Sequence, residues 1–321
     1  MTTPISLYFI GHIAIDEVVI EGKKNKPTLG GSVSYSSLAL KKYSNDARIS
    51  IISNFNKEFS QNSILQLFYQ KNINLEGVQD LNSPNTQFLL DYYNHSRNLV
   101  LQSRCPDLRF SQIPEKFLNN PPDAIVLVPL CNEISYDYIS KLSNTFPNIA
   151  YGIDLQGFIR EIDDGGHVSL VRNEKKIENV HQIIKLLGRN LILKGSEEEM
   201  KILSGEQEWH AVMTYFQQFE GLFIMTLGEK GSMISKKRES ILKIPSFKPK
   251  KVEDETGAGD VYLAIFIYEY IKSSKTWKEI EQIGHLASAA ASFEIEKKGV
   301  KGFANHQKVI ERVYKRNYIS T

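Results

Sequence analysis

The segment VEDETGAGD, residues 252–260, is followed at once by the apolar run VYLAIF, residues 261–266. Small residues at the start of a helix let backbone N–H groups approach an anion closely, and the helix dipole adds partial positive charge there. We therefore interpret Gly257, Ala258 and Gly259 as an anion cradle suited to phosphate, placed where a helix begins.

Asp260 follows this cradle directly. In that position a carboxylate can accept the proton of a hydroxyl, while the N–H groups stabilise charge on a transferring phosphoryl group. The residue is therefore our candidate general base. Taken alone, the same turn also fits an ordinary helix start with an N-terminal acid.

Outward from this segment, apolar runs of strand length alternate with longer stretches of helical periodicity. The predicted strands are residues 6–10, 48–53, 124–128, 150–154, 190–193, 222–226 and 233–234. The predicted helices are residues 31–42, 61–71, 135–145, 177–188, 197–203, 209–219, 259–271, 277–293 and 304–316. This alternation predicts an α/β fold of three layers, α/β/α, with a mostly parallel central sheet.

Two further strands break the alternation. Residues 86–93 and 98–104 flank a polar turn at 94–97, which predicts a hairpin. With residues 14–21 it can form a small sheet that projects from the main one, so we expect a β lid made by segments 14–22 and 86–104. An exposed edge of this lid could pair with a second copy and give a homodimer.

Composition narrows the class of protein. The chain has 321 residues, and 39 Lys plus Arg against 37 Asp plus Glu give a net charge of +2. We therefore expect residues 1–321 to form a single domain with neither a nucleic-acid nor a membrane partner. Cys105 and Cys131 are not spaced like the ligands of a metal site. The apolar N-terminal stretch is not preceded by the Lys or Arg that a signal peptide would have. These features favour a reducing, cytoplasmic location.

The pattern D-x-T-G-A-G-D at 254–260 resembles the C-terminal signature of the ribokinase-like carbohydrate kinases, the pfkB family. Gly30 and Gly31 resemble the di-glycine that opens a helix early in that family, and Asp16 matches its acid that binds substrate hydroxyls. Residues 226–231, TLGEKG, resemble its nucleotide-contacting turn. The resemblance covers nearly the whole chain and implies transfer of a phosphoryl group from ATP to a hydroxyl.

The resemblance also implies sites for the metal and the nucleotide. The run SEEE at 196–199 is similar to the family's N-x-x-E segment, so Glu199 is expected to hold Mg2+ through water. Ser196 stands where the family has Asn, which affects the expected metal site. The residues expected to contact the nucleotide are Thr226, Gly228, Gly231, Thr256 and Ser292.

The substrate is expected beside residues 154–160, DLQGFIR, at the carboxyl end of a predicted strand. Asp154 can bind hydroxyls, while Arg160 can pair with phosphate or carboxylate or form a salt bridge to a nearby Asp. This run resembles the inositol kinase branch and favours a sugar or polyol. Tyr35, where the family has Asn, equally suits a nucleoside.

Two hypotheses from other functional classes are alternatives to a kinase. A non-catalytic ligand-binding or regulatory protein on the same fold would have no need of Asp260 or of the glycines before it. A nicotinamide dehydrogenase would need a glycine fingerprint after the first strand, and residues 11–14, GHIA, do not supply one. We therefore expect a kinase.

Overall fold

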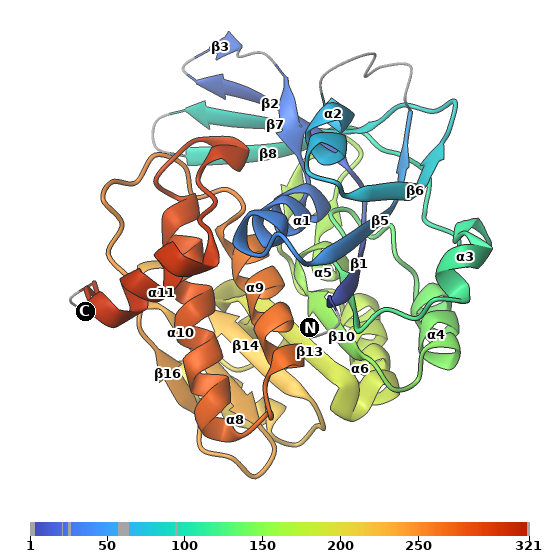
Figure 1. The fold of residues 1–321 in the computed structure, drawn as a ribbon. Helices are drawn as coiled ribbons and strands as arrows, with labels where there is room; N and C mark the ends of the chain where they lie inside the picture. Colours follow the sequence, from blue (N-terminus) through green and yellow to red (C-terminus); the bar gives the residue numbers. More distant parts are fainter. Residues whose placement is uncertain (1–3, 21, 25–26, 57–63, 94–95, 320–321) are drawn as a thin grey trace.

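The computed structural model describes residues 4–20, 22–24, 27–56, 64–93 and 96–319. In this part of the chain a nine-stranded sheet crosses the molecule in the order β16-β15-β14-β13-β10-β9-β1-β5-β6 (Figure 1). Its strands are β1 (Ser6–Ile10), β5 (Arg48–Phe55), β6 (Asn74–Asp80), β9 (Ala124–Leu127), β10 (Ala150–Asp154), β13 (Leu191–Ser196), β14 (Leu222–Thr226), β15 (Ser232–Lys236) and β16 (Leu242–Ile244). All strands from β14 to β6 pair in parallel, whereas β15 and β16 are antiparallel. The predicted mostly parallel sheet is confirmed.

The central strands are apolar on both faces because helices cover both. In β9 every residue is buried, and β1 is buried from Leu7 to Ile10. Leu7 and Phe9 point into one hydrophobic cluster, Tyr8 and Ile10 into another. Continuous apolar runs are expected where a parallel sheet lies between two helical layers.

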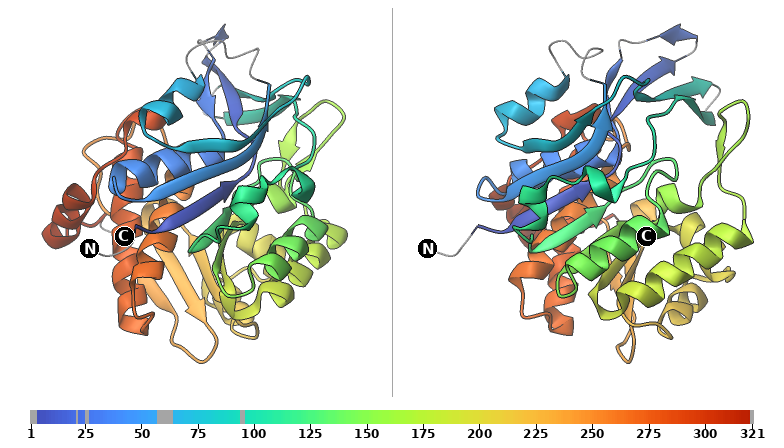
Figure 2. Two further views of the ribbon diagram at one scale, coloured as in Figure 1. Left: turned by 45° about the vertical axis from the view of Figure 1, so that its right-hand side comes forward. Right: turned by 90° about the vertical axis from the view of Figure 1, so that its right-hand side faces the viewer.

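One helical layer is formed by α1 (Ser32–Tyr43), α2 (Ile64–Gln70), α9 (Ala258–Lys272), α10 (Trp277–Glu294) and α11 (His306–Lys315). The opposite layer is formed by α4 (Tyr136–Thr145), α6 (Glu174–Leu187), α7 (Glu197–Ser204) and α8 (Trp209–Phe216). Figure 2 shows these layers on either side of the sheet. The short helices α3 (Glu115–Leu118) and α5 (Gln156–Ile159) lie in connections. The predicted three-layer α/β/α architecture is confirmed.

A small sheet stands apart at the top of Figure 1. It has the strand order β3-β2-β7-β8, with β4 paired to β2. Its strands are β2 (Ala14–Ile20), β3 (Lys23–Lys24), β4 (Thr28–Gly30), β7 (Thr86–Tyr93) and β8 (Ser96–Ser103). The predicted pairing of the two segments is confirmed, although β8 begins earlier than expected. Residues 21 and 94–95 lie outside the described part of the chain.

A second hairpin reaches the outer edge of β8. It consists of β11 (Glu161–Ile162) and β12 (Val168–Ser169). The backbone N–H of Leu101 donates to the carbonyl of Gly166 at 2.7 Å, and Val100 forms a β-bridge with His167. The hairpin therefore covers this part of the small sheet's edge.

Two strands of the main sheet were not predicted, β6 and β16. The sequence of β6, NLEGVQD, is largely polar because it lies at the sheet edge. Its Gly77 packs so closely on β5 that an added Cβ would lie 2.6 Å from the carbonyl oxygen of Ile51. Residues 61–63 of the predicted helix 61–71 lie outside the described residues. Among the described helices, none has the length and apolar character needed to cross a membrane.

Candidate active site

Polar side chains converge at the carboxyl edge of the main sheet. Asp154 ends β10, Thr226 ends β14, and Lys194 lies near the end of β13. Asp260 lies in the first turn of α9, whose N-terminus meets the same edge. Carboxyl ends of parallel strands and helix N-termini are where α/β proteins bind ligands, and anions in particular.

Lys194 occupies the centre of this cluster. Its ammonium nitrogen lies 2.7 Å from Oδ2 of Asp154, and both side chains are buried. A Cβ added to Gly259 would lie 2.7 Å from the same nitrogen, so the ammonium packs against the first turn of α9. Burial opposes its charge, but Asp154, Glu199 and Asp260 outweigh burial and raise the pKa of Lys194. The site therefore holds a protonated lysine.

The environment of Asp260 suits a proton acceptor. Burial, reinforced by the negative charge of Asp154, raises the pKa of Asp260 to about 7. Lys194 and the hydroxyl of Ser32 act in the opposite direction. The helix position is also fixed, because the hydroxyl of Ser36 donates to the backbone oxygen of Asp260 at 3.2 Å. A carboxyl group with a pKa near neutrality can both take and release a proton.

Glu199 is held by a capping box at the start of α7. The backbone N–H of Ser196 donates to Oε2 of Glu199 at 2.8 Å, and the N–H of Glu199 donates to the Ser196 hydroxyl at 3.3 Å. Burial and Asp154 raise the pKa of Glu199. Ser196 thus serves as the N-cap that fixes the acid, a task that Asn also performs.

The di-glycine lies at the junction of β4 and α1. Gly30 packs directly on Asp16, since an added Cβ would overlap that carboxylate. Gly31 is the N-cap of α1 at φ 87, and its Cβ would lie 2.8 Å from the carbonyl oxygen of His12. The structure therefore brings Asp16, Gly30 and Gly31 together beside the N-terminus of α1. Their binding of substrate stays a prediction.

An aromatic side chain packs against the first residue of the cradle. Tyr35, in the first turns of α1, packs on Gly257, where an added Cβ would overlap the ring. Gly257 has φ 85, in the left-handed region that favours glycine. Phe303 meets the Tyr35 ring edge-on, with centroids 6.3 Å apart. Tyr35 thus links the di-glycine helix to the predicted phosphate cradle.

The loop of residues 154–160 borders the same cluster. The Nη1 of Arg160 donates to the carbonyl of Leu130 at 3.1 Å, and its positive charge acts on both Asp260 and Glu199. Gln156 donates through Nε2 to the Ser32 hydroxyl at 3.4 Å. The charges of Asp154 and Arg160 therefore both act on the predicted base, Asp260.

The predicted nucleotide turn is tight and begins at the end of β14. The hydroxyl of Thr226 donates to the carbonyl of Gly195 at 3.3 Å, which ties β14 to β13. Gly228 and Gly231 have φ 59 and 89, and the N–H of Leu227 donates to the carbonyl of Gly231 at 2.8 Å. Both glycines therefore adopt a backbone conformation that favours glycine. At Gly231 an added Cβ would also overlap the carbonyl oxygen of Ile244.

The two other predicted nucleotide residues have partners within the protein. The N–H of Thr256 donates to Oδ1 of Asp254 at 3.0 Å. The hydroxyl of Ser292 donates to the carbonyl of Ala289 at 2.7 Å and accepts from Nη1 of Arg312 at 2.9 Å. Their contact with a nucleotide stays a prediction.

The donor set fits a Mg2+ ion accompanied by phosphate. Asp154, Glu199 and Asp260 supply carboxylate oxygens, which Mg2+ prefers. Burial raises the pKa values of Glu199 and Asp260, and the negative charge of Asp154 raises them further. A bound cation would relieve this repulsion among the carboxylates. Lys194 and the N–H groups of α9 then suit the phosphate oxygens.

Sequence reasoning missed Lys194 and Ser32. Lys194 stands in an otherwise apolar strand, LILKGS, and a lysine at such a position was the available signal. Ser32 follows the di-glycine directly and had no distinguishing pattern.

Comparison with known proteins agrees with this arrangement. The sequence profile of the pfkB family carbohydrate kinases matches residues 8–307. A nucleoside kinase of Methanocaldococcus jannaschii is 40% identical over 102 residues, which cover 32% of this chain and 32% of that enzyme. The matched stretch therefore spans about a third of that relative.

Solved structures share the fold across nearly the full length. Fructokinase from Vibrio cholerae O395, bound to fructose, ADP and calcium, superposes with a TM-score of 0.74 at 16% identity. The match covers 97% of this chain and 100% of that one. A pyrophosphate-dependent kinase of the ribokinase family, bound to a pyrophosphate analogue and myo-inositol, gives a TM-score of 0.73 at 20% identity, covering 95% and 99%. From its fold, its site and the extent of the profile match, this chain belongs to the pfkB family of carbohydrate kinases.

Proposed function

We propose that the protein transfers the γ-phosphoryl group of ATP, in a Mg2+-dependent reaction, to a hydroxyl of a small sugar, polyol or nucleoside. The observation that carries this proposal is the environment of Asp260. This acid, with a pKa raised by burial, lies beside the N–H groups of α9 and the buried ammonium of Lys194. A proton acceptor and an anion site side by side are what in-line phosphoryl transfer requires.

In this mechanism Asp260 takes the proton of the acceptor hydroxyl as its oxygen attacks the γ-phosphorus. A new P–O bond forms, the bond to the β–γ bridging oxygen breaks, and ADP leaves with the electron pair. The backbone of Gly257, Ala258 and Gly259, together with Lys194, stabilises the transferring phosphoryl group. Mg2+, when bound, neutralises phosphate charge, and Glu199 with Asp154 would hold it through its water shell.

The acceptor is proposed to lie between the two sheets. Asp16 and the Gly30–Gly31 backbone would bind its hydroxyls from the small sheet, and Asp154 and Arg160 from the main sheet. Thr226, Gly228, Gly231, Thr256 and Ser292 would contact the nucleotide. The small sheet would then act as a lid that excludes water from the reaction.

A nucleoside is the second candidate acceptor. The Methanocaldococcus relative is a nucleoside kinase, and the Tyr35 ring lies directly over Gly257 beside the di-glycine. A flat ring in that place can pack against a base. A polyol remains the first candidate because Asp16, Asp154 and Gln156 provide hydroxyl-binding groups.

The first experiment is a turnover screen with the full-length protein and Mg-ATP. The acceptors are inositols, pentoses, hexoses, sugar acids and nucleosides, and Asp260→Asn serves as the control. Phosphorylation of one acceptor, lost in the control, supports the proposal and chooses between polyol and nucleoside. A parallel arm replaces ATP by pyrophosphate, and turnover in that arm alone would overturn ATP as donor. Binding without turnover in every arm would favour a ligand-binding regulatory protein.

Self-association through the small sheet remains a separate proposal. The hairpin of β11 and β12 occupies the β8 edge at Leu101, so a second copy would have to pair elsewhere on this sheet. Light scattering of the purified protein tests this directly, and a monomer at micromolar concentration would overturn it.

A further inference from the structure

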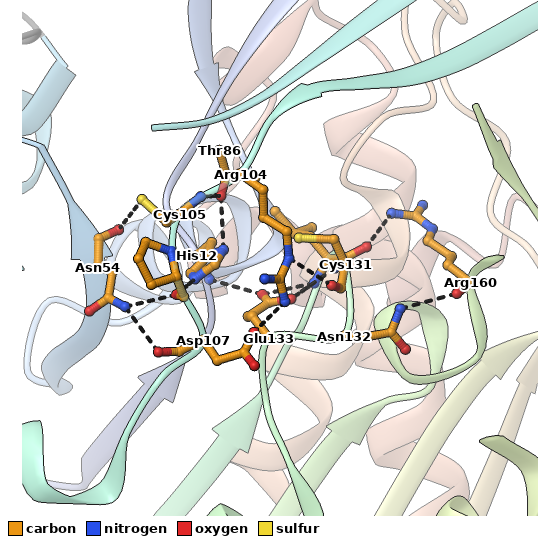
Figure 3. Close-up of polar contacts among 12 residues, drawn as sticks. His12, Asn54, Thr86, Arg104, Cys105, Asp107, Cys131, Asn132, Glu133 and Arg160 are labelled. Atoms are coloured by element: carbon orange, nitrogen blue, oxygen red, sulfur yellow. Dashed lines mark hydrogen bonds and ion pairs between the residues drawn. The ribbon is translucent and has the colours of Figure 1, made fainter. Parts of the chain in front are cut away.

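A buried polar cluster lies where the small sheet joins the main sheet (Figure 3). Its members come from the segments that cross between the two sheets. His12 links β1 to β2, Thr86 begins β7, and Cys105 and Pro106 follow β8. Glu133, from the segment between β9 and α4, lies beneath them and is fully buried.

The Glu133 carboxylate is bound by backbone N–H groups. Oε1 accepts from the N–H of His12 at 3.1 Å and from that of Leu130 at 2.9 Å. Oε2 accepts from the N–H of Cys131 at 2.8 Å. Hydrogen bonds of this kind, made to a charged acceptor away from water, are among the strong ones in proteins. Glu133 therefore fixes the backbone at residue 12 against the β9–α4 connection.

The His12 ring connects the crossings to one another. Its Nε2 lies 3.0 Å from the carbonyl oxygen of Pro106, and its Nδ1 lies 2.8 Å from Oγ1 of Thr86. Burial lowers the pKa of His12, which favours the neutral ring. Because a carbonyl can only accept, Nε2 of the neutral ring carries the hydrogen and Nδ1 accepts from the Thr86 hydroxyl. The same Thr86 oxygen accepts from the N–H of Cys105 at 3.0 Å. One chain of hydrogen bonds thus joins all these crossings.

A metal ion is a less favourable explanation of this cluster. Ligand atoms of His12, Cys131 and Glu133 do lie within 4.8 Å of one another. However, both ring nitrogens of His12 and both oxygens of Glu133 already have protein partners. A metal would have to break these bonds, so the geometry favours a structural network.

The network is connected to the predicted acceptor site by backbone contact. An added Cβ at Gly31 would lie 2.8 Å from the His12 carbonyl oxygen and 2.9 Å from the Ala14 nitrogen. Asp16 follows two residues after Ala14 on β2 and contacts Gly30. A displacement of His12 would therefore move Gly31 and Asp16 together.

We propose that His12, Thr86 and Glu133 are positioning residues that fix where the small sheet leaves the main sheet and so place Asp16 and Gly31 for the acceptor. The placement of Asp16 and Gly31 for an acceptor rests on the proposed function. The attachment of the small sheet does not, and it can be tested without a substrate.

Hydrogen–deuterium exchange of the full-length protein tests the attachment. Thr86→Val removes the hydroxyl and keeps the shape of the side chain, whereas Thr86→Ser keeps the hydroxyl. Tyr151→Phe is the matched control, since it removes a buried hydroxyl that donates to the carbonyl of Leu142, in the layer of α4 and α6. In Thr86→Val we expect exchange about five- to tenfold faster in β2, β4 and β7, from the loss of buried hydrogen bonds.

The same experiment has outcomes that overturn the proposal. In Thr86→Val, exchange in β13 and β14 should stay at the wild-type rate. In Thr86→Ser, exchange in the small sheet should also stay at the wild-type rate. Unchanged exchange in β2 and β7, or an equal rise throughout the protein as in a general loss of stability, would overturn the proposal. Glu133→Gln is a second variant, and the Thr86 pair decides the matter if Glu133→Gln does not fold.

Kinetics test the placement of the acceptor residues, with adenosine, myo-inositol and ribose as probes. In Thr86→Val the KM for the phosphorylated probe should rise about tenfold, while kcat and the KM for ATP change less than about twofold. A fall in kcat with an unchanged acceptor KM would overturn this placement. If the wild type phosphorylates no probe, the proposed function fails, and the exchange result still decides the role of the cluster.

Discussion

Asp260 and Lys194 each shift the pKa of the other through their charges. Burial raises the pKa of Asp260 to about 7, and the Lys194 ammonium keeps it from rising further. Below that pH the carboxyl group is protonated and cannot accept a proton from the acceptor hydroxyl. Activity should therefore increase with pH across the neutral range.

Lys194→Met tests this dependence. Loss of the positive charge should raise the pKa of Asp260, so the acid limb of the kcat/KM profile should move to higher pH. Turnover should also fall, because the transferring phosphoryl group loses a charge partner. Lys194→Arg keeps the charge and should leave the acid limb near that of the wild type. An acid limb at the same pH in Lys194→Met would contradict the electrostatic coupling.

At the scale of a helix terminus, Ser196 is expected to act through the cap of α7. Ser196→Ala should lower the free energy of unfolding by about 1 kcal/mol and raise the Mg2+ concentration needed for half-maximal activity, because Glu199 loses its fixed position. Ser196→Asn should keep both near wild-type values, since Asn is an equally good N-cap. Urea unfolding and a Mg2+ titration of activity measure the two effects.

Gly257, the N-cap of α9, has no room for a side chain. Gly257→Ala should lower turnover about a hundredfold, because the methyl group would overlap the Tyr35 ring and displace the anion cradle. Gly205→Ala is the matched control. Gly205 ends α7 with a similar φ of 80, but the atom nearest to an added Cβ is Nη1 of Arg172, at 3.4 Å. It should lower Tm while turnover per folded molecule stays unchanged.

Elements with strong apolar runs could be predicted, whereas the edge strands β6 and β16 of the main sheet could not. The first and last residues of β14, Leu222 and Thr226, were both predicted correctly, because all residues of this strand but the last are buried. The sequence of β6 is polar because it lies at an edge, so periodicity gave no signal. In the candidate site, the glycines and Asp260 were predicted because they are adjacent in the sequence at the start of one helix. Lys194 was missed because its role depends on Asp154, which lies 40 residues away on the neighbouring strand.

For the protein as a whole, we expect ATP to stabilise the fold only when Mg2+ is present. Without Mg2+, the carboxylates of Asp154, Glu199 and Asp260 repel the phosphates of ATP. Mg-ATP should therefore raise Tm, and at about a hundred times its Kd the gain is about 2.7 kcal/mol. EDTA should remove most of this gain. Differential scanning fluorimetry measures both, and a full Tm increase from ATP in EDTA would contradict a metal-assisted donor site.

The packing of α1 on α9 has a consequence for biosynthesis. α1 leaves the ribosome long before α9, which begins only at Ala258, yet the two helices share one hydrophobic core. Until α9 has been synthesised, α1 can pack on β1 and β5, but the part of its surface that packs on α9 has no native partner. Such exposed surface in a nascent chain favours association with chaperones or aggregation. The packing that brings Tyr35 of α1 against Gly257 at the start of α9 therefore also delays burial of this surface until α9 has been synthesised.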